Sequence, residues 1–170
     1  HVWQALSRYW PGDRSPIERL PLAAVAPEPT IQPPLRLQSV RTPSWATACA
    51  VNGELLVPSE AIPTSDQDRR DNWASVDWIL AAFLLLEGWH ERLWEQRHGP
   101  IHSYSFRLSG WDQRAWQSAW VNRIGLFLRQ WAIQREGTRA ELRLGALPSA
   151  ELLMTHDVDA LHKTLPIRLK

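Results

Sequence analysis

The chain has 170 residues, 44% hydrophobic and 22% charged, which is enough to bury the core of one domain. The 19 Lys and Arg residues nearly balance the 18 Asp and Glu residues, and a net charge of +1 gives no general field for phosphate backbones, so nucleic acid is a poor candidate partner. A single cysteine, Cys49, excludes an intramolecular disulfide and a thiolate metal cluster, and we expect it to be a small buried hydrophobic residue.

Residues 1–63 contain ten of the 13 prolines, and proline disfavours long helices. Apolar and polar residues alternate over 35–40, which predicts a strand there. The pair Asn52-Gly53 signals a hairpin turn, and the apolar run after it predicts a second strand near 54–57. The chain does not begin with Met and shows no basic-then-apolar leader. We therefore expect a fragment whose start is missing, with a slight preference for the cytoplasm.

A long helix is predicted from about 73 to 95, with Asp71 or Asn72 as its N-terminal cap. Its uncharged apolar run, 78–86, is far shorter than the ~20 residues that a membrane span needs. This part of the helix is therefore expected to be buried in the protein, and no membrane span is predicted.

The second half of this predicted helix is polar. Glu87, Glu91 and Arg92 lie at helical spacing and are expected to form a solvated, salt-linked surface. Gly88 is expected to end the first part of the helix or to allow close packing, and the sequence His98-Gly99-Pro100 is expected to end the whole helix.

A second helix is predicted over 112–136, ended by Gly137. Trp116, Trp120 and Trp131 recur on its apolar face, which favours a role in the core or at a domain interface over a role as sugar platforms. The polar residues expected to lie off that face are Arg123, Arg129 and Gln130.

The chain has 11 tryptophans, far more than its three Phe and two Tyr residues, and an indole ring is a surface on which sugars can stack. Four of them stand in loop-like or poorly periodic sequence. The candidates for exposed stacking are therefore Trp3, Trp10, Trp45 and Trp111.

A strand candidate over 151–154 runs directly into a polar sequence that contains Asp157 and Asp159. A strand sends residues i and i+2 to the same face, so the two carboxylates would point the same way. One carboxylate could then bind a metal while the other takes a proton from the metal-bound water. The alternatives are a solvated strand end or a helix cap at Asp159, and His156 is expected to support the strand end rather than to bind metal.

The sequence from Leu152 to Asp159, with Lys163 close behind, resembles the first motif of the polysaccharide deacetylase family. The upstream region is similar to a domain that precedes the deacetylase domain in a subset of bacterial proteins. Together the two similarities cover roughly residues 50–170. The upstream similarity is carried by Asn52-Gly53-Glu54-Leu55-Leu56, Ala74, the run from Ala81 to Glu91, His98-Gly99 and Val121-Asn122.

The resemblance implies hydrolysis of an acetamido or similar acyl group on a polysaccharide or amino-sugar substrate, catalysed on a distorted (β/α) barrel. It gives Asp157 the role of general base. It makes Asp159 a ligand of a divalent metal, zinc in the intact parent, beside two histidines of a later His-x-x-x-His motif. Val158 stands between the two aspartates, so the sequence resembles the Asp-x-Asp variant of a family that more often has adjacent aspartates.

His98 and His102 also have His-x-x-x-His spacing, but they precede the aspartates, and the Gly-Pro between them breaks the helix that the geometry needs. We therefore reject them as the metal motif. Without a later His motif, this chain by itself is expected to be inactive and to hold no metal tightly.

The predicted fold class is α/β. Residues 1–148 are expected to form an accessory domain in which a small mixed sheet, with a third strand near 139–144, is covered by the two long helices. Residues 149–170 are expected to open a truncated (β/α) deacetylase barrel. The alternative function is a non-catalytic, Trp-rich domain that binds carbohydrate or serves as a scaffold, with Asp157 and Asp159 merely closing a strand.

Overall fold

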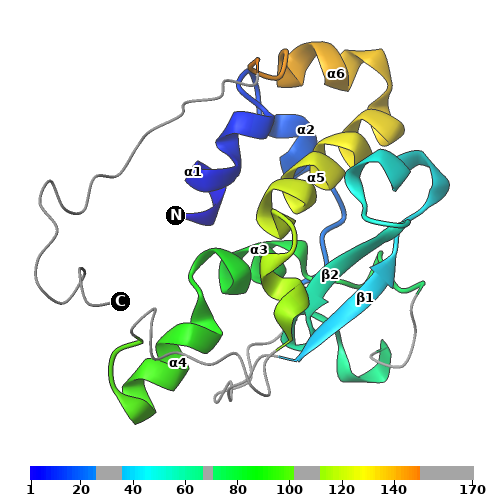
Figure 1. Ribbon diagram of the computed structural model, residues 1–170. Coiled ribbons are helices and arrows are strands. Elements are labelled where there is room, and N and C mark those ends of the chain that lie inside the picture. Colours follow the sequence, from blue (N-terminus) through cyan, green and yellow to red (C-terminus); the bar gives the residue numbers. More distant parts are fainter. Residues whose placement is uncertain (26–35, 67–70, 102–111, 150–170) are drawn as a thin grey trace, which may run out of the picture.

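The computed structural model describes residues 1–25, 36–66, 71–101 and 112–149 (Figure 1). Helices dominate these ranges, and the strands form one small antiparallel sheet. The α-helices are α1 (Val2–Leu6), α2 (Ser15–Glu18), α3 (Trp78–Leu86), α4 (Trp89–His98), α5 (Trp120–Glu136) and α6 (Thr138–Leu144), and the strands are β1 (Leu37–Arg41) and β2 (Glu54–Pro58). Short 3-10 helices are η1 (Ser7–Tyr9), η2 (Ser44–Cys49), η3 (Ser59–Ala61), η4 (Thr64–Asp66) and η5 (Gln113–Trp116).

The two predicted strands pair with each other, in a register that sets Leu37 opposite Pro58. The turn before β2 has the predicted form, because Asn52 and Gly53 adopt φ values of 52° and 78°. The flanking residues Val51 and Glu54 exchange both backbone hydrogen bonds, at 2.9 and 3.0 Å. The hairpin signal in the sequence is therefore confirmed, although η2 is inserted between β1 and the turn.

The first predicted helix is two helices, and its predicted start is wrong. Asp77, not Asp71 or Asn72, is the cap: its Oδ1 accepts a hydrogen bond from Leu80 N at 2.8 Å, and α3 begins one residue later. Asn72 is buried instead, where its Nδ2 donates to the Asp66 carbonyl. Gly88, in the left-handed region at φ 56°, separates α3 from α4 as predicted.

The end of α4 is confirmed at His98, and the end of α5 is confirmed at Glu136, directly before Gly137 at φ 68°. The predicted start of the second helix at 112 is wrong, because Asp112 caps only the short η5. The helix α5 proper begins at Trp120.

The strand predicted near 139–144 is wrong, because this segment is the helix α6. Ala140 and Leu144, one helical turn apart, are the buried residues, whereas Leu142 is 82% exposed. Over so few residues, an alternation of polar and apolar side chains does not distinguish a strand from a helix. The mixed sheet therefore loses its third strand, and the described part is a helix-rich architecture with a two-stranded antiparallel sheet.

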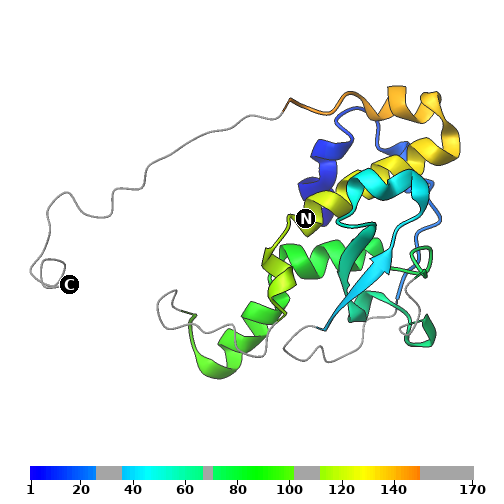
Figure 2. The same cartoon turned by 45° about the vertical axis from the view of Figure 1, so that its right-hand side comes forward.

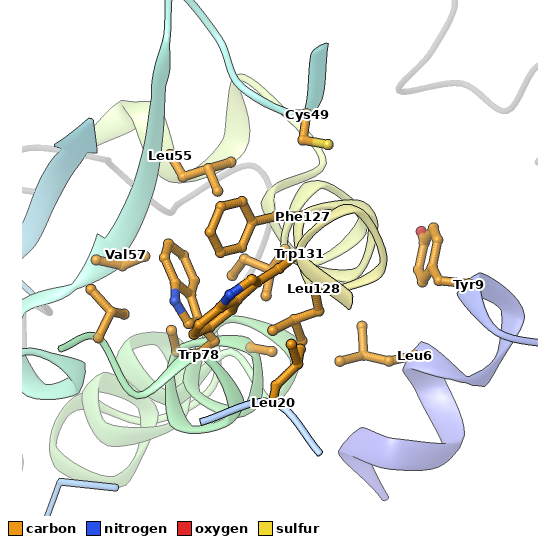
Figure 3. Close-up of a cluster of buried hydrophobic side chains, with 14 of the residues drawn as sticks. Leu6, Tyr9, Leu20, Cys49, Leu55, Val57, Trp78, Phe127, Leu128 and Trp131 are labelled. Atoms are coloured by element: carbon orange, nitrogen blue, oxygen red, sulfur yellow. The ribbon is translucent and has the colours of Figure 1, made fainter. Parts of the chain in front are cut away.

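Helix α5 is the centre of the core and lies between α1 on one side and the sheet on the other (Figures 1 and 2). Its Phe127 and Leu128 are completely buried (Figure 3). The ring of Phe127 lies 4.6 Å from that of Trp78 on α3 and 5.6 Å from that of Trp45 on η2. Burial of this apolar surface is the main stabilising contribution, because it removes large aromatic areas from water.

Most of the described tryptophans serve this core. Trp120 and Trp131 are buried as predicted, but Trp116 is 44% exposed, which excludes a place in the core and leaves its predicted alternative, a domain interface, as a prediction. Trp10 is 4% exposed and therefore cannot be the exposed stacking surface that its context predicted. Trp3 and Trp45, also predicted as exposed, are half-buried against the core, and Trp111 lies outside the described residues. None of the described helices is long and apolar enough to cross a membrane.

Candidate functional site

The residues with the most specific predicted chemistry, Asp157 and Asp159, lie outside the described residues, as do His156, Lys163 and His102. The predicted strand at 151–154 lies there too. What the structure describes is the part of the chain that leads into this motif.

No group of three His, Cys, Asp or Glu side chains within the described ranges is arranged to hold a metal ion. His98 is exposed in the last turn of α4 and makes local contacts. Its Nδ1 lies 3.0 Å from the Trp94 carbonyl oxygen, and its ring stacks on Trp94 with centroids 4.5 Å apart. The divalent metal that the resemblance implies therefore has no site among these residues.

The charged surface predicted at the junction of α3 and α4 is present. Glu87 pairs with Arg92 at 3.0 Å and with His1 at 3.0 Å. Arg92 also donates from Nε to the Glu87 carbonyl, at 2.6 Å. These contacts tie the chain start to the α3 end, which is a structural role.

Cys49 is buried as predicted, at the end of η2. Burial raises the pKa of its thiol, and the nearby Arg123 only partly opposes this effect. A thiol with a raised pKa is a poor nucleophile at neutral pH, so the hydrophobic role is the one that the environment favours.

The C-terminal end of α6 precedes the part of the chain that carries the Asp157 motif. Residues 12 and 13, in the loop between η1 and α2, fix this end through backbone contacts. Gly12 N donates to the Leu144 carbonyl at 3.0 Å, and Asp13 N donates to the Arg143 carbonyl at 2.7 Å. A Cβ at position 12 would lie 2.4 Å from the Arg143 oxygen, so this approach requires glycine. The two segments are therefore fixed to each other by backbone contacts.

Arg129 provides the second anchor of this end, from within the protein. It is 7% exposed, although its sequence position predicted that it would lie off the apolar face of α5. Its Nη1 donates to the Tyr9 carbonyl at 2.8 Å, and its Nη2 donates to the Gly145 carbonyl at 2.7 Å. The two carbonyl oxygens lie at the C-terminal ends of η1 and α6. The C-terminal end of a helix carries partial negative charge, which favours a cation.

No described carboxylate forms an ion pair with Arg129. Burial lowers the pKa of its guanidinium, and the more distant Glu141 opposes this effect. The side chain stays a cation because the normal pKa of arginine is far above neutral pH. It therefore acts as a buried clamp between two chain segments.

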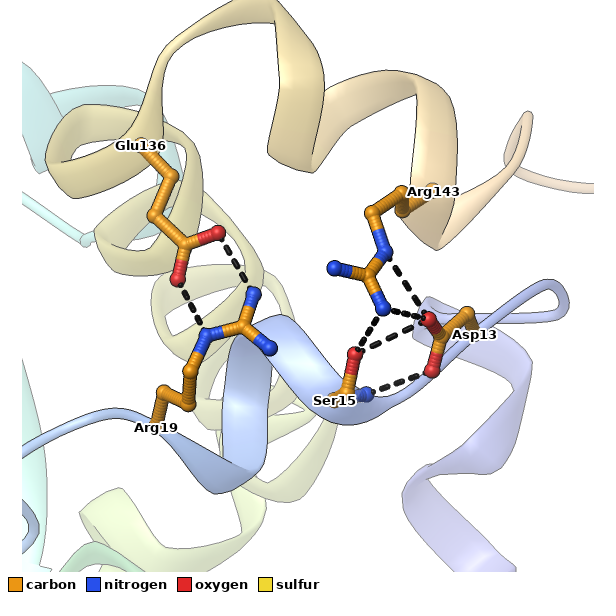
Figure 4. Close-up of polar contacts among 5 residues, drawn as sticks. All are labelled: Asp13, Ser15, Arg19, Glu136 and Arg143. Carbon is orange, nitrogen blue, oxygen red and sulfur yellow. Dashed lines mark hydrogen bonds and ion pairs between the residues drawn. The ribbon is translucent and has the colours of Figure 1, made fainter.

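A third anchor is a polar cluster on the surface beside α2 (Figure 4). Asp13 accepts from the Ser15 backbone N–H at 2.8 Å and from the Ser15 hydroxyl at 2.9 Å, and it pairs with Arg143 of α6. Next to it, Arg19 binds both carboxylate oxygens of Glu136, at 2.9 and 2.6 Å. The Ser15 hydroxyl donates to Asp13 and accepts from Arg143, and a carboxylate with a lowered pKa is too weak a base to activate it, so these contacts favour a structural role over that of a nucleophile.

The cluster holds the pKa of Asp13 at about 2, below its ordinary value of 3.8. The causes, in order, are the Ser15 N–H, the Ser15 hydroxyl and the Arg143 guanidinium. Because the pKa is lower in the folded state, the stabilisation is fully present above about pH 4 and is lost as the pH falls through about 2.

We expect Ser15→Ala to reduce the steepness with which the free energy of unfolding falls between pH 4 and pH 2. The substitution removes one of the hydrogen bonds that lower the pKa of Asp13. Urea titrations at half-unit pH steps measure this slope. Ser7→Ala is the matched control, because the Ser7 hydroxyl donates only to the nearby Gln4 carbonyl, so an equal change in both variants contradicts the prediction.

A groove of about 650 Å³ opens beside the Arg129 anchor. It lies between η2, one face of α5, and α6 with the chain that follows it. Its walls are mainly apolar and include Cys49, Leu126, Ile133, Leu142 and Leu147, and the polar residues Arg129, Gln130 and Glu141 also line it. Sequence reasoning missed both the groove and its arginine, because no local pattern shows that η2 and α6 meet on the same face of α5.

A scan against protein-family models, a search of curated proteins and a search of solved structures each found no match to this chain.

Proposed function

We propose that the chain is the N-terminal part of a metal-dependent, polysaccharide deacetylase-like hydrolase. In this proposal residues 1–148 form a non-catalytic scaffold, and residues 149–170 begin the catalytic domain. The observation that supports the scaffold role is the anchoring of the α6 end, directly before the segment that carries the Asp-x-Asp motif.

The anchoring has a mechanical consequence for any domain that follows. Gly12, Asp13 and Arg129 hold the backbone at 143–145 through three hydrogen bonds, and the Asp13 carboxylate also pairs with the Arg143 side chain. Because residues 143–145 are held in this way, the chain that follows them starts from a fixed position and direction. A flexible linker, by contrast, is rich in Gly and Ser and lacks such contacts.

The chemistry in this proposal belongs to two residues. Asp157 takes a proton from the attacking water, and Asp159 is one ligand of a divalent metal. When bound, that metal lowers the pKa of its water and polarises the substrate carbonyl. The water oxygen bonds to the carbonyl carbon, and the C–N bond breaks as the proton taken from the water is passed to the amine nitrogen, which releases acetate and leaves a free amine on the sugar.

The test is metal-dependent acetate release by the full-length product of the coding sequence. We expect Asp157→Asn to lower the rate by about 10²–10⁴-fold, the usual contribution of a general base. Glu151→Gln, a carboxylate outside the motif, is the matched control and is expected to retain activity. Release that is insensitive to chelation, or equal in Asp157→Asn and the control, contradicts the proposed function.

The second candidate, a carbohydrate-binding module, draws support from one observation, the 44% exposure of Trp116 on η5. Titration with soluble oligosaccharides distinguishes the two. Saturable quenching of tryptophan fluorescence that is lost in Trp116→Ala favours the binding module, and no response favours the scaffold.

A further inference from the structure

The groove beside Arg129 is a concave and mainly apolar surface on the described residues. Leu142 and Leu147, which line it, are 82% and 44% exposed. Large apolar side chains that converge on one concave surface mark an interaction site more often than do scattered ones. The groove is therefore shaped for an apolar partner.

The position of the groove in the chain indicates which partner this is. Ala146 and Leu147 form part of its wall, and residue 150 follows only three positions after Leu147. An extended residue spans about 3.3 Å, so the side chains at 152 and 153 are within roughly 10–13 Å of Ser149. The segment 150–170 is thus tethered at the mouth of the groove.

This tethered segment also has the right composition. It is rich in large apolar side chains, which include Leu152, Leu153, Met154, Leu161, Leu165 and Ile167. A partner joined by so short a connection binds at an effective concentration in the millimolar range, which a separate molecule rarely reaches. The tether therefore favours this segment over a second copy of the chain.

From these observations we infer that the groove formed by η2, α5 and α6 is the docking surface for the chain's own segment 150–170. The surface proposed to receive it includes the exposed Leu142 and Leu147 beside Cys49 and Ile133. This docking role rests on the scaffold function proposed above, but not on hydrolase activity. It goes beyond that function because it names the surface against which the catalytic segment packs.

Cysteine cross-linking tests the docking in the 170-residue chain. In a Cys49→Ala background, Ala48→Cys places a thiol on the groove wall, where Ala48 is exposed. The Ala48→Cys substitution is combined in turn with Leu152→Cys, Leu153→Cys and Leu161→Cys, and the disulfide is formed with a mild oxidant. We expect at least one pair to cross-link within a monomer, at a rate independent of protein concentration.

Two controls make the result specific. Ala119→Cys replaces Ala48→Cys at an exposed alanine outside the groove lining, and we expect its rate to be at least 10-fold lower. Leu142→Glu is expected to slow the cross-link at least 10-fold, because it puts a charge in the groove wall. Leu86→Glu, at another exposed leucine, is expected to leave the rate unchanged.

Three results overturn the docking: no cross-link in any pair, equal rates from positions 48 and 119, or covalent dimers whose yield rises with protein concentration. The last result identifies a second copy as the occupant. Failure of the cross-link together with normal metal-dependent acetate release rejects the docking alone. Cross-linking without acetate release rejects the hydrolase activity alone.

Discussion

Phe127→Ala is expected to lower the free energy of unfolding by about 3–5 kcal/mol, the usual cost of removing a buried phenylalanine ring. Phe127 has no exposed surface, and its ring lies within 6.1 Å of four tryptophan rings. The four rings come from η2, the loop before α3, α3 and α5, and belong in that order to Trp45, Trp73, Trp78 and Trp131. Alanine leaves a cavity where these segments meet, and the rigid indole rings cannot fill it by small shifts.

Urea denaturation followed by far-ultraviolet circular dichroism measures this loss without relying on the tryptophan signal, which the substitution itself alters. Gln134→Ala is the control, because Gln134 is exposed on the same helix and outside the groove, and its truncation is expected to cost less than about 0.5 kcal/mol. A loss below about 1 kcal/mol for Phe127→Ala would show that the aromatic cluster is not the centre of the core.

Gly125→Ala is expected to destabilise the protein by about 1–3 kcal/mol, although alanine is the better helix former. In an open helical position the same change stabilises by about 1 kcal/mol. Here a Cβ would lie 2.3 Å from Cδ2 and 2.6 Å from Cε2 of Tyr9, whose ring is buried against α5. Steric overlap therefore outweighs helix propensity and separates the η1 segment from α5.

The matched control is Asn122→Ala, which raises helix propensity at an exposed position on the same helix. Thermal unfolding of both variants, and of Gly125→Ala combined with Tyr9→Ala, separates the two effects. With the ring removed, the added methyl group is expected to cost less than in the Tyr9 protein. A stabilising effect of Gly125→Ala in the presence of Tyr9 would contradict the close approach of these segments.

Local signals in the sequence were sufficient where neighbouring residues determine the structure. The Asn52-Gly53 turn is confirmed because both positions need a positive φ, which these residue types adopt most readily. Gly88 and Gly137 end helices for the same reason. The burial of Cys49 is also confirmed, since a small apolar side chain between alanines has no polar group that needs water.

Boundaries failed where several residues compete for one role. Asp77 is the cap of α3 because its carboxylate reaches Leu80 N, whereas Asn72 uses its side chain to hold Asp66. The segment 139–144 alternates like a strand, yet it folds as a helix because Ala140 and Leu144 find apolar cover one turn apart. Tertiary packing selects between two patterns that the sequence permits.

The candidate site also combines a feature set by neighbouring residues with one set by distant residues. The Asp157 and Asp159 pair is visible in the sequence because the two residues are only two positions apart, and its role remains a prediction. The anchor made by Gly12, Asp13 and Arg129 had no sequence signal, because it joins residues 16 to 132 positions apart.

The sequence by itself determined the Asn52-Gly53 turn and the ends of the main helices, which depend on residues close together in the chain, and it predicts the chemistry of Asp157 and Asp159. Only the tertiary structure decided that α5 is the central element, that Arg129 is buried and that η2 and α6 enclose a groove. The physical reason is that burial depends on which distant segments meet, and those contacts leave no periodic pattern in the sequence.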